Sequence, residues 1–190
     1  MKSMNKIFKL LSIAIIPLVT NSCVISFAKK SNQLTIENYT IIDGDTIRFF
    51  DKKNSKFNSI RILGIDTPET LKKYNKVAKL ENIYANKAKD FLYSICSKKP
   101  IHIEIHSKDK YNRLVAIVKN FKNKDVAKEL ISEGLARVKY ISKTRNKLTY
   151  WNNKNEIMNY YDELITIQSI AKKSKKGFWQ FNENLVFAKK

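Results

Sequence analysis

Two short carboxylate-bearing runs hold the residues of this 190-residue chain that are best suited to chemistry. The first run reads DGDT over residues 43–46, and the second reads RILGIDTPE over residues 61–69. If the strands that carry the two runs pair, the carboxylates of Asp45 and Asp66 meet beside the guanidinium of Arg61. A hard divalent cation prefers oxygen ligands of this kind, and a guanidinium binds phosphate through parallel hydrogen bonds. The runs therefore predict a site for a divalent cation, a water nucleophile and a phosphodiester.

Hydrophobic spacing predicts the elements that position these runs. Residues 35–50 are rich in β-branched and aromatic side chains around Gly44, which predicts one long bent strand or two strands. We place the first run inside one strand. Further strands are predicted at 57–65, 101–105 and 114–119, and helices at 79–97, between Asp125 and Gly134, and at 153–174. This order predicts a small, partly open barrel of the oligonucleotide-binding (OB) type.

The composition favours a polyanionic partner. Lys and Arg number 37 against 17 Asp and Glu, a net charge of +20, and such a field attracts nucleic acid or an anionic surface. The alternative is that Lys and Asn are simply common here, as an AT-rich genome would produce. A hydrophobic content of 43% argues against general disorder, and two cysteines cannot build a disulfide framework. We expect Cys96 to be buried in a helix, and His102 and His106 to lie at the surface on one face of a strand.

The N-terminus has the features of a targeting segment. Residues 1–9 contain three lysines and no acid, and residues 10–19 form an apolar run, which is the order of a secretory signal. The run is too short to span a bilayer as a helix, which takes about 20 apolar residues. The stretch VTNSC resembles a bacterial lipobox, which implies that Cys23 is lipidated and that residues 1–22 are removed. The alternative is an ordinary secretory signal with a chance cysteine, and both place the protein outside the cytoplasm.

Five motifs, taken in order, resemble the staphylococcal (micrococcal) thermonucleases. They are DGDT at 43–46, the arginine-led DTPE run at 61–69, DKYNR at 109–113, GLARV at 134–138 and GFW at 177–179. The resemblance implies an α+β fold that is mainly a β barrel, with a five-stranded OB-fold barrel and three helices. It also implies Ca²⁺-dependent cleavage of DNA and RNA that leaves 3′-phosphate ends.

The resemblance assigns a metal site to the first two motifs. It implies that Asp45 and Asp66 bind Ca²⁺ through their side chains and that Thr67 does so through its backbone carbonyl. Asp43 corresponds to a minor contributor close to the metal. A pair of aspartates around a glycine also occurs as a plain turn, but the two motifs together favour the metal site.

The resemblance also assigns the catalytic groups. Arg61 and Arg113 correspond to guanidinium groups that bind the phosphate, where they stabilise the extra negative charge of the transition state. Glu69 corresponds to a general base that orients or deprotonates the attacking water. The residues expected to contact a terminal phosphate or to stack on a base are Lys110, Tyr111 and Tyr140. For Tyr140 the alternative is an ordinary core residue, and for Lys110 a solvated side chain.

These expectations combine into one leading hypothesis. The chain is expected to comprise a lipoprotein-type signal (1–22), a tether (23–34), a nuclease domain (35–181) and a C-terminal tail (182–190). The nuclease would be lipid-anchored on the outer face of the cell membrane, or alternatively secreted, with DNA and RNA as substrates and no protein partner implied. The main rival is an OB-fold lipoprotein that binds nucleic acid without cleaving it. A third possibility is a basic membrane adhesin.

Overall fold

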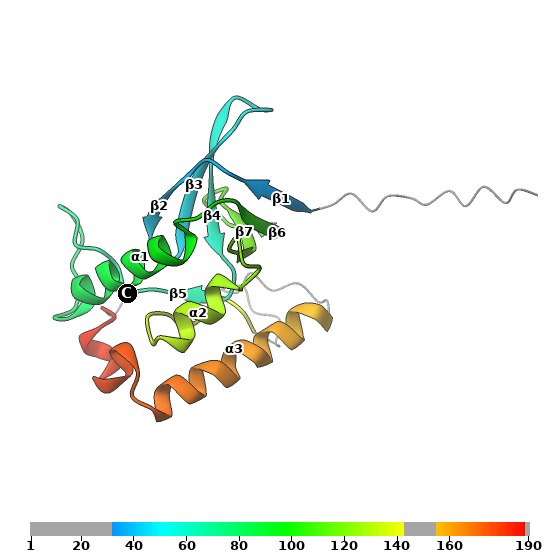
Figure 1. Ribbon diagram of the computed structural model, residues 1–190. Helices are drawn as coiled ribbons and strands as arrows, with labels where there is room; N and C mark the ends of the chain where they lie inside the picture. The colour runs from blue at the N-terminus through cyan, green and yellow to red at the C-terminus, as the bar shows by residue number, and fades with distance from the viewer. Residues whose placement is uncertain (1–31, 143–154, 189–190) are drawn as a thin grey trace, which may run out of the picture. The chain divides into compact units, whose positions relative to one another are not determined.

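The structure, a computed structural model, describes residues 32–142 and 155–188 (Figure 1). Its strands are β1 (Gln33–Ile36), β2 (Tyr39–Asp43), β3 (Thr46–Asp51), β4 (Lys56–Ile62), β5 (Ile65–Asp66), β6 (Ile101–Lys108), β7 (Leu114–Lys119) and β8 (Arg137–Val138). Its helices are α1 (Glu81–Cys96), α2 (Val126–Ser132) and α3 (Asn155–Lys173), followed by the 3-10 turns η1 (Gly177–Gln180) and η2 (Glu183–Leu185). No helix within the described residues is long and apolar enough to cross a bilayer.

The main sheet is a curled OB-type sheet with the strand order β1-β6-β7-β4-β3-β2. Its two outer strands, β1 and β2, are consecutive in the chain and are separated by the bend at residues 37–38. One bent stretch therefore pairs with β6 through its first half and with β3 through its second half. Counted in this way, the barrel has the five strands that were predicted. The predicted α+β class with an OB barrel and three helices is confirmed.

Alternation along β3 and β4 separates the core face of these strands from the outer face. Ile47 and Ile60 are paired across the two strands and are fully buried. Along β3, Arg48 and Phe50 alternate with Ile47 and Phe49, point to the other face and are exposed, because successive side chains of a strand alternate between faces. The β3–β4 hairpin projects away from the three helices (Figure 1). Arg61 lies at its base, opposite Thr46.

The DGDT run is a turn, so the prediction that it lies inside one strand is wrong and the two-strand alternative is correct. Residues 44–45 connect β2 to β3, whose register shifts between Ile41 and Asp43. A Cβ on Gly44 would lie 2.7 Å from the Cβ of Ala88 on α1. Glycine is therefore required here by the close approach of the turn to a helix.

The predicted helices are present with short boundary differences. Asp125 caps α2 by accepting a hydrogen bond from the backbone N–H of Lys128, and Gly134 follows the helix with φ +62°. A Cβ on Gly134 would lie 2.1 Å from the carbonyl oxygen of Lys176. This close backbone contact joins the end of α2 to the segment before η1. Phe178, within η1, is fully buried.

The prediction for His106 is wrong. The register of β6 against β7 shifts between Ile105 and Ser107, so His106 is the extra residue of a bulge, where the regular alternation of faces is interrupted. The side chain of His106 is 8% exposed, with Nε2 3.5 Å from Oε1 of Glu104. His102 is exposed as predicted, and Cys96 is buried as predicted.

Candidate active site

Arg61 joins the two predicted metal-binding aspartates at the base of the β3–β4 hairpin. Its Nη1 donates to Oδ1 of Asp45 at 2.5 Å, and its Nη2 donates to Oδ1 of Asp66 at 3.2 Å. All three residues are buried, at 8%, 3% and 6% exposure respectively. The pairing of β3 with β4 and the short strand β5 thus bring together the two sequence runs, as predicted.

Asp45 is held on both of its oxygens. Oδ1 also accepts a hydrogen bond from the hydroxyl of Thr46, and Oδ2 accepts one from the backbone N–H of Thr67 at 3.1 Å. Burial nevertheless raises the pKa of the Asp45 carboxyl above its ordinary value, although Arg61 and Thr67 act to lower it. The surrounding protein therefore compensates this buried charge incompletely.

The second oxygen of Asp66 faces a different set of cations. Oδ2 accepts hydrogen bonds from Nε and Nη2 of Arg137, at 3.0 and 2.8 Å, and lies 3.6 Å from Nζ of Lys139. Arg137 also donates to Glu183 at 2.6 Å, and its guanidinium carbon lies 3.6 Å from the ring centre of Phe187. Arg137 therefore links Asp66 to the C-terminal segment.

Glu69 is positioned by a second, buried glutamate. The carboxylate of Glu81, which is 2% exposed, accepts hydrogen bonds from the backbone N–H groups of Glu69, Ala78 and Ala188. One side chain thus fixes the start of the loop after β5, the approach to α1 and the C-terminal segment. Glu69 is half-buried and is among the acids that raise the pKa of Arg61.

A pocket of about 480 Å³ opens beside these residues. Asp66, Thr67 and Glu69 line it on one side, and residues 182–184 and 187–188 line it on the other. Val186, between them, is fully buried. The described part of the segment expected to be a C-terminal tail therefore packs against the domain and forms a wall of the site.

The β6–β7 turn carries Arg113 and its neighbours. Nε of Arg113 donates to Oδ2 of Asp109 at 2.6 Å, and Oδ1 of Asp109 accepts from the backbone N–H groups of Tyr111 and Arg113. Asn112 holds the turn with φ +62°. The parallel pairing of β4 with β7 sets Arg61 opposite Val115, two residues after Arg113. The turn therefore lies next to the strand of Arg61, although Arg113 pairs with Asp109 and with neither Asp45 nor Asp66.

The aromatic residues predicted to contact substrate lie in two places. Tyr111 is 67% exposed on the turn, with Nζ of Lys110 and the guanidinium carbon of Arg113 at 5.0 and 5.3 Å from its ring centre. Tyr140 lies at the buried site, with the guanidinium carbon of Arg61 5.6 Å from its ring centre. An exposed ring between two cations is suited to stacking on a base next to phosphates.

The donor chemistry of the site fits Ca²⁺. Asp45, Asp66 and the backbone of Thr67 offer oxygens, which this hard cation prefers. Within the described residues, no group of three or more His, Cys, Asp or Glu side chains is arranged to hold a metal ion. Backbone and water oxygens would therefore complete the shell. The cation would compete with Arg61 at both aspartates, and with Arg137 and Lys139 at Asp66. Asp43 accepts a hydrogen bond from the hydroxyl of Thr70 and lies 3.8 Å from Nζ of Lys72.

The roles of Glu81, Arg137 and Glu183 were not predicted from the sequence. Arg137 was part of a recognised motif, but nothing in the motif indicates that it pairs with Asp66. Glu81 at a helix start is typical of an acid that stabilises the helix dipole. Its contact with Ala188 spans 107 residues, and no local pattern predicts it. Cys23, the predicted lipidation site, lies outside the described residues.

Comparison with known proteins gives a consistent family assignment. The family model described as "Staphylococcal nuclease homologue" matches residues 59–181. A thermonuclease of Staphylococcus hyicus is 32% identical over 154 residues, which is 78% of this chain and 78% of that protein. Endonuclease YncB of Bacillus subtilis (strain 168) is 32% identical over 78% of this chain and 64% of its own length. A thermonuclease of Staphylococcus intermedius is 33% identical over 60% of this chain and 67% of its own length.

Proposed function

Because the chain belongs to the family of staphylococcal nuclease homologues, we propose that it is a Ca²⁺-dependent nuclease that hydrolyses DNA and RNA to products with 3′-phosphate ends. The observation that carries this proposal is the bridge that Arg61 forms between the buried carboxylates of Asp45 and Asp66. The bridge supports the proposal because a guanidinium can bind phosphate and carboxylates are ligands that a hard cation prefers. A protein that only bound nucleic acid would gain nothing from two acids buried at the phosphate site.

In this proposal, the residues of the site have different roles in hydrolysis. The guanidinium of Arg61 has five N–H groups, so it can hold the aspartates and still donate to a phosphate oxygen. Arg113, fixed by Asp109, donates to the same phosphate from the β6–β7 turn. These positive groups stabilise the additional charge of the pentavalent transition state more than that of the ground state.

Glu69 acts on the attacking water. Its carboxylate, which Glu81 holds in place through the backbone, orients the water and accepts its proton as the water oxygen bonds to phosphorus. The bond from phosphorus to the 5′-oxygen breaks, and that oxygen takes a proton from solvent. The phosphate therefore stays on the 3′-oxygen. Ca²⁺ held by Asp45, Asp66 and the carbonyl of Thr67 would polarise the phosphate and offset its charge.

The test of this function is a cleavage assay with the purified full-length chain. Single-stranded DNA and RNA are incubated with Ca²⁺ or with chelator, and the product ends are identified by mass spectrometry. We expect cleavage in Ca²⁺ alone, 3′-phosphate ends from both substrates, and at least a 100-fold lower rate for Arg113→Ala. Full activity in chelator, or 5′-phosphate ends, would contradict the proposal.

The location is a separate proposal that rests on the N-terminal sequence. A signal-like segment followed by Cys23 supports a lipid-anchored enzyme on the outer face of the membrane, and secretion is the alternative. In cells that produce the protein, Cys23→Ser should move the activity from the membrane fraction to the medium. Retention of the variant in the membrane fraction would contradict lipidation at Cys23.

A further inference from the structure

We propose that the outer face of the β3–β4 hairpin is a track for single-stranded nucleic acid that begins at Arg61 and ends on the ring pair of Phe50 and Phe57. This inference rests on the proposed nuclease function and extends it. It assigns a subsite to residues that lie outside the pocket and away from the turn that carries Arg113.

The strand register places the track on one face. Across β3 and β4, Thr46 lies opposite Arg61, Arg48 opposite Ser59, and Phe50 opposite Phe57. Directly opposite residues of an antiparallel pair point to the same side, and alternate residues share a face. The intervening pair Ile47 and Ile60 is fully buried on the other side. Arg61, Arg48 and the phenylalanine pair therefore follow one another along the outer face.

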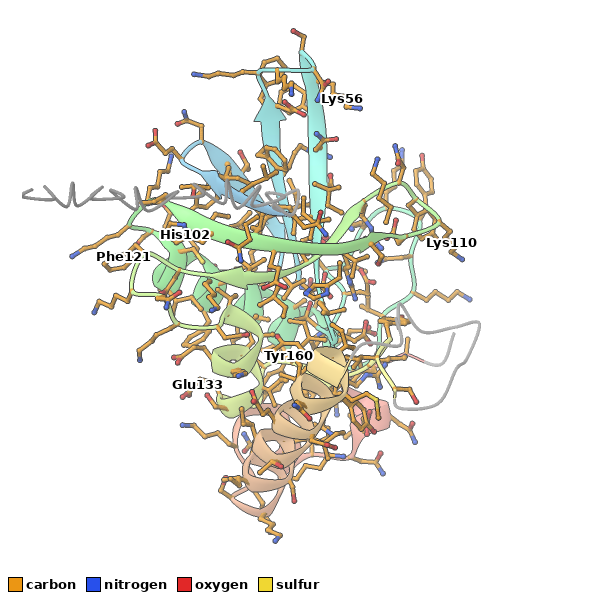
Figure 2. The ribbon with its side chains drawn as sticks, turned by 90° about the vertical axis from the view of Figure 1, so that its right-hand side faces the viewer. Lys56, His102, Lys110, Phe121, Glu133 and Tyr160 are labelled. Carbon is orange, nitrogen blue, oxygen red and sulfur yellow. The ribbon has the colours of Figure 1, made fainter. Side chains whose placement is uncertain are left out.

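The far end of the track is an exposed aromatic platform. Phe50 and Phe57 are 45% and 71% exposed, and their rings meet edge to face with centres 5.2 Å apart. Exposed phenylalanines are costly in contact with water, and a pair at the end of a projecting hairpin indicates a binding surface. Figure 2 shows Lys56 near the tip of this hairpin, well separated from Tyr160 near the start of α3. Lys52 and Lys53 also lie at the tip, in the turn.

The length and chemistry of the face fit a strand of nucleic acid. Phe57 precedes Arg61 by four residues of β4, which corresponds to about 13 Å at the usual rise of a strand. This is several times the spacing of about 3.4 Å between stacked nucleotides in DNA. Arg48, exposed between the two ends, is placed to contact an intervening phosphate. Cations that alternate with aromatic rings bind single strands with little dependence on sequence.

A lipid surface is the competing occupant, since basic residues and exposed phenylalanines also occur at membrane interfaces. Two features favour nucleic acid. The face is continuous in register with Arg61, which binds the scissile phosphate in the proposed function. The exposed arginine also lies between that site and the rings, where a strand leaving the site would pass.

The test measures binding without catalysis. The full-length chain, the double variant Phe50→Ala/Phe57→Ala, Arg48→Ala and the control Phe121→Ala are titrated against a fluorescent 20-nucleotide single strand in chelator. Phe121 is a matched control, because it is exposed and its ring lies near Lys98 and Lys122 but belongs to the β7–α2 turn. Loss of stacking on one base should raise the Kd of the double variant at least about fivefold. Arg48→Ala should lower the slope of log Kd against log salt by about 1.

Two further experiments identify the cause of any loss of nucleic-acid binding. With Ca²⁺, the double variant should lose kcat/KM on the 20-nucleotide strand and keep it on a dinucleotide, which has a single nucleoside on each side of its phosphate and is too short to reach the rings. Unchanged binding of the 20-nucleotide strand, or an equal loss in Phe121→Ala, would overturn the track. Loss of binding to phosphatidylglycerol vesicles with full oligonucleotide binding would overturn it in favour of a membrane contact. Absence of cleavage by the wild-type chain would refute the nuclease function and leave the binding test valid.

Discussion

Arg61 donates a hydrogen bond of 2.5 Å from Nη1 to Oδ1 of Asp45, and both side chains are almost completely buried. Burial alone would lower the pKa of Arg61, but the charges of Asp45 and Asp66 raise it above its ordinary value. The same guanidinium therefore neutralises the buried acids, and in the proposed function it also donates hydrogen bonds to a phosphate. Replacement of Arg61 should therefore lower both the free energy of unfolding and the rate of cleavage.

Arg61→Lys tests this double role. Lysine keeps the charge but lacks the planar guanidinium whose two Nη groups donate to both aspartates. We expect kcat to fall about 100- to 1000-fold and the free energy of unfolding to fall by about 1–3 kcal/mol. Cleavage kinetics and urea unfolding measure the two effects. The control is Lys124→Ala, which removes an exposed ion pair with Glu129 and should cost less than about 1 kcal/mol. An unchanged free energy of unfolding in Arg61→Lys would show that the buried Asp45 carboxylate does not need the hydrogen bond from Arg61.

Glu81→Gln tests how Glu69 is positioned. The carboxylate of Glu81 accepts N–H groups from three separate segments, and an amide would direct its own donors at one or more of them. We expect a loss of about 1–3 kcal/mol in the free energy of unfolding and a lower kcat with little change in Ca²⁺ affinity.

Calorimetric titration of Ca²⁺ and cleavage kinetics separate these effects. Glu163→Gln is the matched control, because Glu163 is an exposed partner of Lys128 far from the site. If Glu81→Gln kept the wild-type kcat, the positioning role would be refuted.

Gly44→Ala tests the close approach of the β2–β3 turn to α1. The added methyl would lie 2.7 Å from the Cβ of Ala88 and 3.0 Å from Cγ2 of Thr67, so we expect a loss of about 1–3 kcal/mol from overpacking. Ala88→Gly alone should cost about 1 kcal/mol in helix propensity. The double variant should be more stable than the sum of the single losses predicts, as measured by urea unfolding. Strict additivity would mean that the turn and the helix do not touch.

The burial of Cys96 can be tested by alkylating its thiol at different pH values. The thiol is 1% exposed, and burial raises its pKa to about 12. Since the thiolate is the nucleophile, the native protein should leave Cys96 unlabelled by iodoacetamide from pH 8 to pH 10, a range in which an ordinary cysteine ionises. Urea should expose it to complete labelling. Mass spectrometry of the peptide that contains Cys96 gives the extent, and rapid labelling of the native chain at pH 8 would contradict its burial.

Local signals in the sequence predicted the features that depend on local interactions. The cap at Asp125 and strand β6 were predicted because capping and alternation involve near neighbours in the chain. The motifs also predicted that Asp45 and Asp66 would meet at Arg61.

Features that depend on distant contacts were not predicted. Three examples are the packing of the Gly44 turn against α1, the orientation of His106 at a bulge against β7, and the contacts of Glu81 and Arg137 with the C-terminal segment. Each involves residues far apart in sequence, for which periodicity and spacing carry no signal.

The most direct test of the account is the rate at which the full-length chain cleaves single-stranded DNA as Ca²⁺ is raised, in the wild type, Asp45→Ala and the control Glu163→Gln. The account predicts cleavage that saturates with Ca²⁺ in the wild type and in Glu163→Gln. It predicts a rate at least about 100-fold lower in Asp45→Ala at every concentration. Equal cleavage by Asp45→Ala, or a wild-type rate that does not respond to Ca²⁺, would contradict a metal-dependent site at Asp45, Arg61 and Asp66.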